Sequence, residues 1–145
     1  MIAINYPKHD FRTKTELGKT LIFDEWRKLW VTLSPEEWVR QHVLLYLTNT
    51  LNYPSALIAI EKELDLGGMK KRFDVLVYDR NHQPWLMIEC KAMDVNLDVK
   101  VLEQVMRYGI SIPAPYLVIT NGSYTLGWER RDGTLVPIEQ FPLWT

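Results

Sequence analysis

The strongest constraint on the fold is a pair of apolar stretches, RFDVLVYD at residues 72–79 and PWLMIECKA at residues 84–92. The first stretch alternates between apolar and polar residues, which is typical of a strand. The polar segment RNHQ between them is typical of a turn. Together they predict two neighbouring antiparallel strands. The second strand is unusual because its apolar run leads directly into Glu89, Cys90 and Lys91.

Helices and further strands are predicted on both sides of this hairpin. A helix is predicted from Pro35 to about residue 51, because Ser34 fits the N-cap and Glu37 completes a capping box. A second helix is predicted over residues 96–110, with Leu97, Val101, Gln104 and Tyr108 along one stripe. Strands are predicted at residues 56–66 and 116–122, with one or two short strands within residues 20–33 and a hairpin over residues 124–138. This order predicts an α/β sandwich in which helices flank a central mixed sheet.

The composition fits one globular domain over residues 1–145. The chain is 47% hydrophobic and 24% charged, so it can bury a core rather than stay disordered. Residues 1–19 are polar and irregular, and we expect an N-terminal arm or a short extra element there. Nothing resembles a signal peptide or a membrane span of ~18 apolar residues, and the single cysteine excludes an internal disulfide. We therefore expect a cytoplasmic protein without a membrane partner.

Strand alternation predicts a cluster of charges at the end of the hairpin. Glu89 and Lys91 point to one face of their strand and Cys90 to the other. If the turn is centred in the middle of RNHQ, Asp74 lies directly opposite Glu89. Opposed carboxylates about 5 Å apart repel each other, so we expect a cation between them. Mg²⁺ is the first candidate, with Mn²⁺ as a substitute, because both accept carboxylate oxygens.

A divalent cation beside a lysine is the arrangement used in metal-assisted phosphodiester hydrolysis. The metal holds a phosphate oxygen and lowers the pKa of a bound water, while Lys91 is placed to stabilise charge on the phosphate. Simpler interpretations stay open. Asp74 could be a polar residue on a solvated strand face, and Glu89 with Lys91 could form an ordinary surface ion pair.

These residues carry a family resemblance. Asp74 followed by Glu89-Cys90-Lys91 resembles the D…(D/E)-x-K motif of the PD-(D/E)XK nuclease superfamily. Gln104-x-x-x-Tyr108 resembles the Q-x-x-x-Y element of RecB-like nucleases and type I restriction R subunits. The segments LSPEEWVRQHVLLYL, KRFDVLVYD, IECKAMDVNL and YLVITNG resemble the N-terminal domain of type I restriction R subunits, in its small stand-alone form.

The resemblance implies a restriction-endonuclease-like fold and a Mg²⁺-dependent DNA nuclease. Asp74 and Glu89 would be the metal ligands, the carbonyl of Cys90 would add a third oxygen, and Lys91 would be the catalytic lysine. Restriction R subunits continue into an ATP-driven motor, whereas this sequence carries no motor motif. The segment TKTELGKT ends like a P-loop, but it lacks the first glycine and no strand precedes it.

Four further residues are weaker candidates. By resemblance, Gln104 and Tyr108 would contact DNA or support the site, and Glu37 would match an acidic residue of the first helix. The alternatives are that Gln104 and Tyr108 lie on a helix face packed on the sheet, and that Glu37 serves only the capping box. Glu61, on the predicted strand next to Asp74, is a candidate further acid.

The partners expected are DNA, a second copy of the chain, or other subunits of a restriction system. Arg40, Arg72 and Arg107 are candidate DNA phosphate contacts, although exposed arginines are common. A homodimer would let one small subunit address both strands of a duplex. The net charge of −1 gives no general attraction to nucleic acid, although a local basic face can coexist with it.

The first function expected is therefore a DNA endonuclease or nuclease domain. The second is a non-cleaving nucleic-acid-binding or assembly module on the same fold, which the small size and near-neutral charge favour. An unrelated small-molecule site on an α/β domain is a third, weaker alternative. The set of Asp74, Glu89 and Lys91 favours cleavage, because opposed carboxylates serve no purpose in a site without chemistry.

Overall fold

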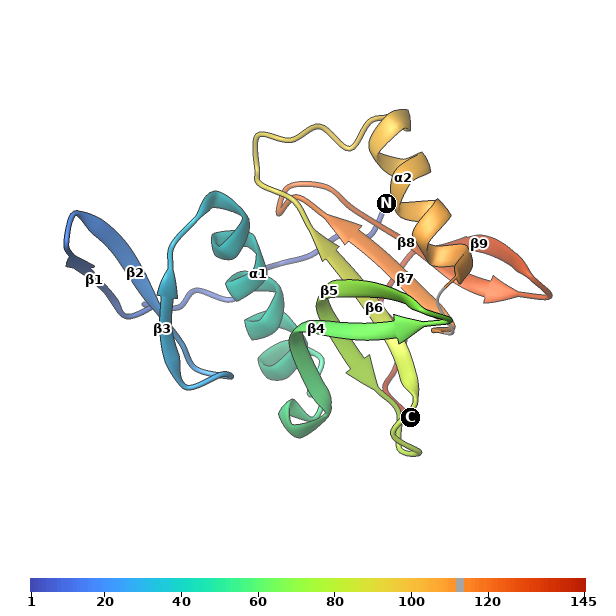
Figure 1. Ribbon diagram of the computed structural model, residues 1–145, viewed down its shortest axis with the longest axis horizontal. Helices are drawn as coiled ribbons and strands as arrows, with labels where there is room; N and C mark the ends of the chain where they lie inside the picture. The colour runs from blue at the N-terminus through green and yellow to red at the C-terminus, as the bar shows by residue number, and fades with distance from the viewer. Residues whose placement is uncertain (112–113) are drawn as a thin grey trace.

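The computed structural model describes residues 1–111 and 114–145, apart from the side chains of residue 66 and residues 108–111. Figure 1 shows four layers: a small sheet, helix α1 (Pro35–Leu45), a large sheet and helix α2 (Val99–Ser111). The large sheet is therefore covered by a helix on each face, which confirms the predicted α/β sandwich. Within the described residues, no helix combines the length and apolarity that crossing a membrane requires.

The small sheet is antiparallel and has the order β1-β2-β3. Its strands are β1 (Thr13–Glu16), β2 (Lys19–Asp24) and β3 (Leu29–Thr32). Strands β2 and β3 confirm the prediction for residues 20–33, and β1 is the short extra element expected near the N-terminus. The turn before β2 contains Leu17 and Gly18 at φ 51° and 76°, the left-handed pair that joins strands in a two-residue hairpin.

Helix α1 begins where the capping box predicts. The Ser34 hydroxyl accepts a hydrogen bond from the backbone N–H of Glu37 at 3.0 Å, and Pro35 occupies the first turn. The helix continues as a π-helical turn, Tyr46–Thr50, so helical backbone extends almost to the predicted end at residue 51. Asn52, at φ 56°, then turns the chain away.

The large sheet is mixed and has the order β4-β5-β6-β7-β8-β9. Its strands are β4 (Ile58–Leu66), β5 (Met69–Tyr78), β6 (Pro84–Cys90), β7 (Tyr116–Thr120), β8 (Thr125–Arg131) and β9 (Thr134–Ile138). Strands β6 and β7 pair in parallel and the other neighbours are antiparallel. Helix α2 connects the parallel pair, as a crossover connection must.

The two faces of the large sheet form two separate cores. Ile88 and Cys90 of β6 pack with α1 residues such as Val43, whereas Met87 packs on the other face with Val105 of α2. Alternate residues of one strand therefore serve different cores, as strand geometry requires. Cys90 is 1% exposed, which confirms that it points away from Glu89 into the α1 side.

Candidate functional site

The pairing of β5 with β6 brings two carboxylates together. Val75 pairs with Ile88, so the next position along each strand places Asp74 opposite Glu89. This is the register that a turn centred in RNHQ predicts. Next to the turn, Tyr78 pairs with Pro84, and a bulge between Val77 and Tyr78 then shifts the ladder by one residue into the register that brings Asp74 opposite Glu89.

Asp74 is held in a fixed orientation by two donors. Its Oδ2 accepts a hydrogen bond from the backbone N–H of Cys90 at 2.7 Å, and its Oδ1 accepts one from Arg40 Nη2 at 3.1 Å. The carboxylate thus bridges β5 and β6 just beyond the last pair of the ladder. Because one donor belongs to the sheet and the other to α1, the position of Asp74 depends on both layers.

Glu89 lies in a less favourable electrostatic environment than Asp74. Burial and the negative charge of Asp74 raise the pKa of Glu89 to about 8, and the nearby Lys91 ammonium offsets only part of that shift. Because burial and a facing carboxylate both disfavour its charged form, Glu89 keeps its proton to a higher pH than a free carboxyl does. This pair is the least neutralised acidic group in the cluster.

A third acidic side chain, Glu61, lies on the neighbouring strand β4. The β4–β5 ladder pairs residues on both sides of Glu61 and Asp74 but omits these two positions. Glu61 has φ 52°, a left-handed conformation that is rare for a non-glycine residue within a strand. Glu61, Asp74 and Glu89 therefore form a row across three adjacent strands, at a point where the backbone is distorted.

Arg40 connects this row to α1. Its Nη1 donates to Glu37 Oε1 at 2.8 Å and to Glu61 Oε1 at 2.9 Å, while Nη2 donates to Asp74. Arg40 is 5% exposed, so the sequence-based interpretation of it as a surface phosphate contact does not fit its position. Its buried Nε has no hydrogen-bond partner among the described residues.

The first turn of α1 contains two glutamates with different surroundings. Burial and then the charge of Asp74 raise the pKa of Glu36, with Arg40 and Lys91 opposing the shift. Glu37 is buried and binds Arg27 Nη2 at 2.9 Å as well as Arg40. Glu37 therefore reaches Asp74 only through Arg40.

Sequence reasoning selected Glu37 and missed Glu36. The capping box draws attention to Glu37, whose backbone N–H does bond Ser34. The usable signal for Glu36 is its spacing of four residues from Arg40, because residues i and i+4 share a helix face. Without knowledge that Arg40 contacts Asp74, that spacing had no meaning.

A cleft of about 460 Å³ opens beside this cluster, between β3, the start of α1 and β4. Its lining is mainly charged and polar: Arg27, Val31, Thr32, Ser34, Glu36, Glu37, Arg40 and Glu61. Of the acidic row, Glu61 lines this cleft directly, and Arg40, which also lines it, contacts Asp74.

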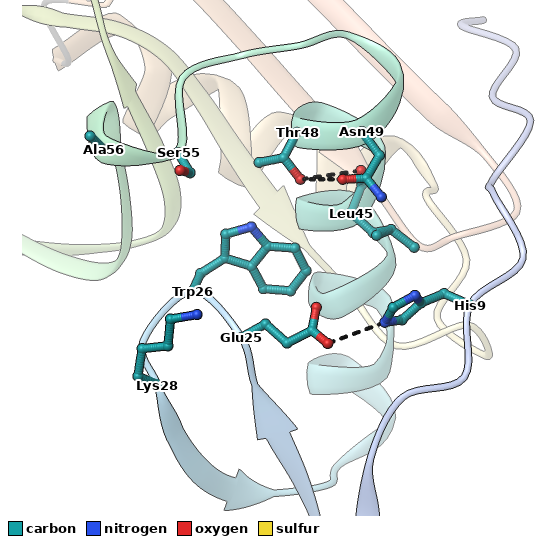
Figure 2. Close-up of a pocket in the computed structure, with 9 residues that line it drawn as sticks. All are labelled: His9, Glu25, Trp26, Lys28, Leu45, Thr48, Asn49, Ser55 and Ala56. Atoms are coloured by element: carbon teal, nitrogen blue, oxygen red, sulfur yellow. Dashed lines mark hydrogen bonds and ion pairs between the residues drawn. The ribbon is translucent and has the colours of Figure 1, made fainter.

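A second cavity, of about 470 Å³, lies elsewhere, around the β2–β3 turn. Figure 2 shows Trp26 extending from that turn between Ser55 and Thr48, and Glu25 directed at His9. The His9 Nε2 to Glu25 Oε1 distance is 3.3 Å. None of the carboxylates of the acidic row lines this cavity, so it is separate from the candidate site.

The remaining predicted residues are dispersed. Gln104 is exposed, whereas the inward face of α2 is formed by Val101, Leu102, Val105 and Met106. The predicted stripe was therefore correct for Val101 but wrong for Gln104. Side-chain placement of Tyr108 lies outside the described part of the chain.

The three arginines do not converge on one surface. Arg72 is exposed on β5 and pairs with Glu61, Arg107 is exposed on α2, and Arg40 is buried. Arg40 and Arg72 share Glu61 as a partner but differ in exposure, and the DNA contacts of Arg72 and Arg107 stay predictions.

The donor set at the centre suits a hard cation. Among the described residues, no three His, Cys, Asp or Glu side chains already form a group able to hold a metal ion. Mg²⁺, however, is usually held by one or two carboxylates and keeps several waters. Asp74 and Glu89 provide two such carboxylates, and the raised pKa of Glu89, caused by burial and by the charge of Asp74, is what a site short of positive charge produces.

The chain is similar to a known protein family over most of its length. Residues 35–142 match the family described as type I restriction enzyme R protein N terminus. No curated protein sequence is significantly similar to the chain. A crystal structure of a proposed nuclease of family DUF820 from Anabaena variabilis aligns with 87% of this chain and 80% of its own, with TM-score 0.49 and 9% identity.

Proposed function

Because the chain belongs to the family of type I restriction enzyme R-protein N-terminal domains, we propose that it is a Mg²⁺-dependent nuclease domain that hydrolyses DNA phosphodiester bonds. The observation that carries this proposal is the opposition of Asp74 and Glu89 across β5 and β6, with Lys91 beside them. Membership of a restriction family supports DNA as the substrate. It also supports other subunits of such a system as partners.

Asp74 and Glu89 would hold the metal, with the carbonyl of Cys90 as a third oxygen. When bound, Mg²⁺ would polarise a phosphate oxygen and lower the pKa of a coordinated water. Binding would also remove the repulsion between the two carboxylates and displace the proton that Glu89 retains.

The other side chains of the site then have separate tasks. The Cys90 N–H and Arg40 orient Asp74, so that its carboxylate is in place before substrate arrives. Lys91 stabilises negative charge on the phosphate as the bond to the leaving oxygen breaks. Glu36, whose raised pKa lies closer to neutrality than that of a free carboxyl, accepts a proton from the attacking water.

One contact favours the non-cleaving alternative. Arg40 already neutralises part of the charge on Asp74 at 3.1 Å, and it also binds Glu37 and Glu61. A site whose carboxylates are all satisfied by arginines would need no metal. The nuclease therefore requires a divalent cation at Asp74 and Glu89, whereas the non-cleaving module does not.

Mn²⁺ titration by calorimetry separates these functions. We expect saturable binding by the wild type and at least tenfold weaker binding by Asp74→Asn and Glu89→Gln, because each removes a charged ligand. Glu129→Gln is the matched control: Glu129 is also on the large sheet and is paired with Arg131, so its loss should leave Mn²⁺ affinity unchanged.

Cleavage of plasmid DNA with Mg²⁺ then tests the chemistry. Lys91→Ala should retain Mn²⁺ binding but lose at least a hundredfold in cleavage rate, since the lysine acts on the phosphate rather than the metal. Equal Mn²⁺ affinity for wild type and Asp74→Asn would reject the metal site. Tight metal binding without cleavage of any DNA form would favour the non-cleaving module.

A further inference from the structure

The outer face of the small sheet combines aromatic and basic side chains. Cross-strand pairing puts Phe23 opposite Trp30, and their rings meet edge to face at 5.4 Å. On β1 and just before it, Lys14 and Arg12 point to the same face. Both aromatic residues are half-buried although this is the outermost layer in Figure 1.

The cations lie directly over the rings. The Arg12 guanidinium carbon is 4.5 Å from the centre of the Phe23 ring and 5.5 Å from that of Trp30, and Lys14 Nζ is 4.4 Å from the Trp30 ring. Lys14 also pairs with Glu16 at 3.1 Å. The side chains that cover the rings are therefore exposed, flexible cations rather than core residues.

The two faces of this sheet have opposite character. The inner face presents Ile22 and Asp24, both fully buried, and Val31, which lines the catalytic cleft. The outer face presents three cations, at Arg12, Lys14 and Lys19, against one carboxylate, at Glu16, as strand alternation and pairing require.

This outer face is positively charged in a chain whose net charge is −1. Charge complementarity therefore selects a polyanion as its ligand. The half-buried rings beneath the exposed cations select a polyanion with flat groups, which stack on the rings where its phosphates draw the cations aside. Single-stranded nucleic acid has both properties, because its bases are unpaired and its backbone is anionic. A DNA duplex offers phosphates but hides its base faces.

We propose that the outer face of β1–β3 binds a single-stranded DNA segment, with bases stacked on Trp30 and Phe23 and phosphates held by Arg12 and Lys14. This inference rests on the proposed nuclease function for its choice of DNA as the polymer. The small sheet precedes residue 35, so it lies outside the matched family segment. It adds a surface for holding an unwound strand near the cleft.

The connection to the cleft runs through β3. Trp30 is on the outer face, while the next residues, Val31 and Thr32, line the cleft with Ser34. A strand crossing the edge of β3 would pass from the aromatic face to the acidic row. The aromatic face would thus position single-stranded DNA for cutting without contacting the reacting phosphate.

Fluorescence anisotropy with a labelled oligothymidylate of about 12 nucleotides, in EDTA, tests this surface without engaging the metal site. Trp30→Ala should weaken binding about tenfold, within the range for loss of one stacked base, whereas Trp30→Phe should stay within about threefold. Arg12→Gln with Lys14→Gln should reduce the slope of log affinity against log salt by about 1.4, or ~0.7 for each lost phosphate contact.

Arg80→Gln is the matched control for the cations. Arg80 lies over the ring of Trp144 at 5.1 Å, so the variant also removes a cation from an aromatic ring but does so elsewhere. Arg80→Gln should bind the oligothymidylate with the affinity of the wild type and with the same slope of log affinity against log salt. Because the glutamine variants leave both rings in place, they test the surface even if Trp30→Ala fails to fold.

Each outcome decides the proposal. Loss of binding in Trp30→Ala or in the glutamine pair, with Arg80→Gln unchanged, supports it. Wild-type affinity in these variants, or no binding by the wild type, overturns it. It is also overturned if a DNA duplex binds as tightly as the oligonucleotide and its affinity is unchanged in Trp30→Ala. Asp74→Asn should bind the oligonucleotide normally in EDTA, so failure of the metal site and failure of this surface are distinguishable.

Discussion

Asp24 and Glu89 are both acids held inside a polar cluster, yet their pKa values shift in opposite directions. Burial would raise the pKa of Asp24, but N–H groups of Arg27 and Gln41 donate to it and lower the pKa overall. Burial and Asp74 together raise the pKa of Glu89 to about 8.

The difference lies in the partners rather than in the depth of burial. The Asp24 carboxylate is fully enclosed, and every direction in which it accepts is filled by a donor, including the backbone N–H of Trp26 at 2.8 Å. Glu89 faces another carboxylate and one lysine. A cluster with complete pairing stabilises the fold, whereas a cluster that lacks positive charge is suited to binding a cation.

The Asp24 cluster also links the two sheets. Arg27 donates to Asp24 at 2.7 Å and to Glu37 at 2.9 Å, and Gln41 donates to both acids from the next turn of α1. The chain of contacts then continues through Arg40 to Asp74. The Asp24 cluster thus supports the arginine that orients the proposed metal ligand.

The largest expected loss of folding stability comes from removing the carboxylate of Asp24. Asp24→Ala should lower the free energy of unfolding by about 3–5 kcal/mol, because it leaves buried donors of Arg27 and Gln41 without an acceptor. Urea denaturation measures the loss. Glu63→Gln, which removes an exposed and loose pair with Lys70 at 3.9 Å, is the control and should change little. An equal effect of both substitutions would contradict the structural role.

A loss of folding stability of intermediate size is expected from the Asp74–Glu89 pair, and this loss depends on pH. The folded state holds a proton on Glu89 between its ordinary pKa of 4.5 and about 8, so the metal-free protein should lose stability as pH rises through that window. Allowing for solvent screening, the loss should be about 2 kcal/mol. Urea denaturation in EDTA at several pH values measures it.

Glu89→Gln removes the titrating group and should flatten this part of the pH profile. Saturating Mg²⁺ should also remove the loss in the wild type, because the cation replaces the proton. Parallel pH profiles for wild type and Glu89→Gln would show that the pair is not the source of the dependence.

The smallest effect is expected at Gln104. Since its side chain is exposed on α2, Gln104→Ala should change the free energy of unfolding by less than about 0.5 kcal/mol and leave Mn²⁺ affinity unchanged. The neighbouring Val105→Ala, at a buried position, should cost about 2 kcal/mol. A clear loss of Mn²⁺ affinity in Gln104→Ala would place this residue closer to the site than its exposure indicates.

Local patterns predicted much of the fold and the centre of the site. The capping box at Ser34 set the start of α1, and a turn centred in RNHQ predicted Asp74 opposite Glu89, a register that the structure reaches through a bulge next to the turn. Both depend on residues close in sequence, where backbone geometry leaves few alternatives. The predicted stripe on α2 was partly wrong because Gln104 and Val105 are adjacent. A small rotation of the helix about its axis is enough to exchange the exposed and the buried position.

The sequence by itself determined the elements and the expectation of two opposed acids beside Lys91, because strand alternation acts locally. Only the tertiary structure decided that Arg40 is buried among carboxylates, that Glu36 lines the cleft while Glu37 binds Arg27, and that the small sheet covers α1. Those contacts join segments far apart in sequence, and long, flexible charged side chains can reach several partners. Packing of the layers selects which partner each one meets.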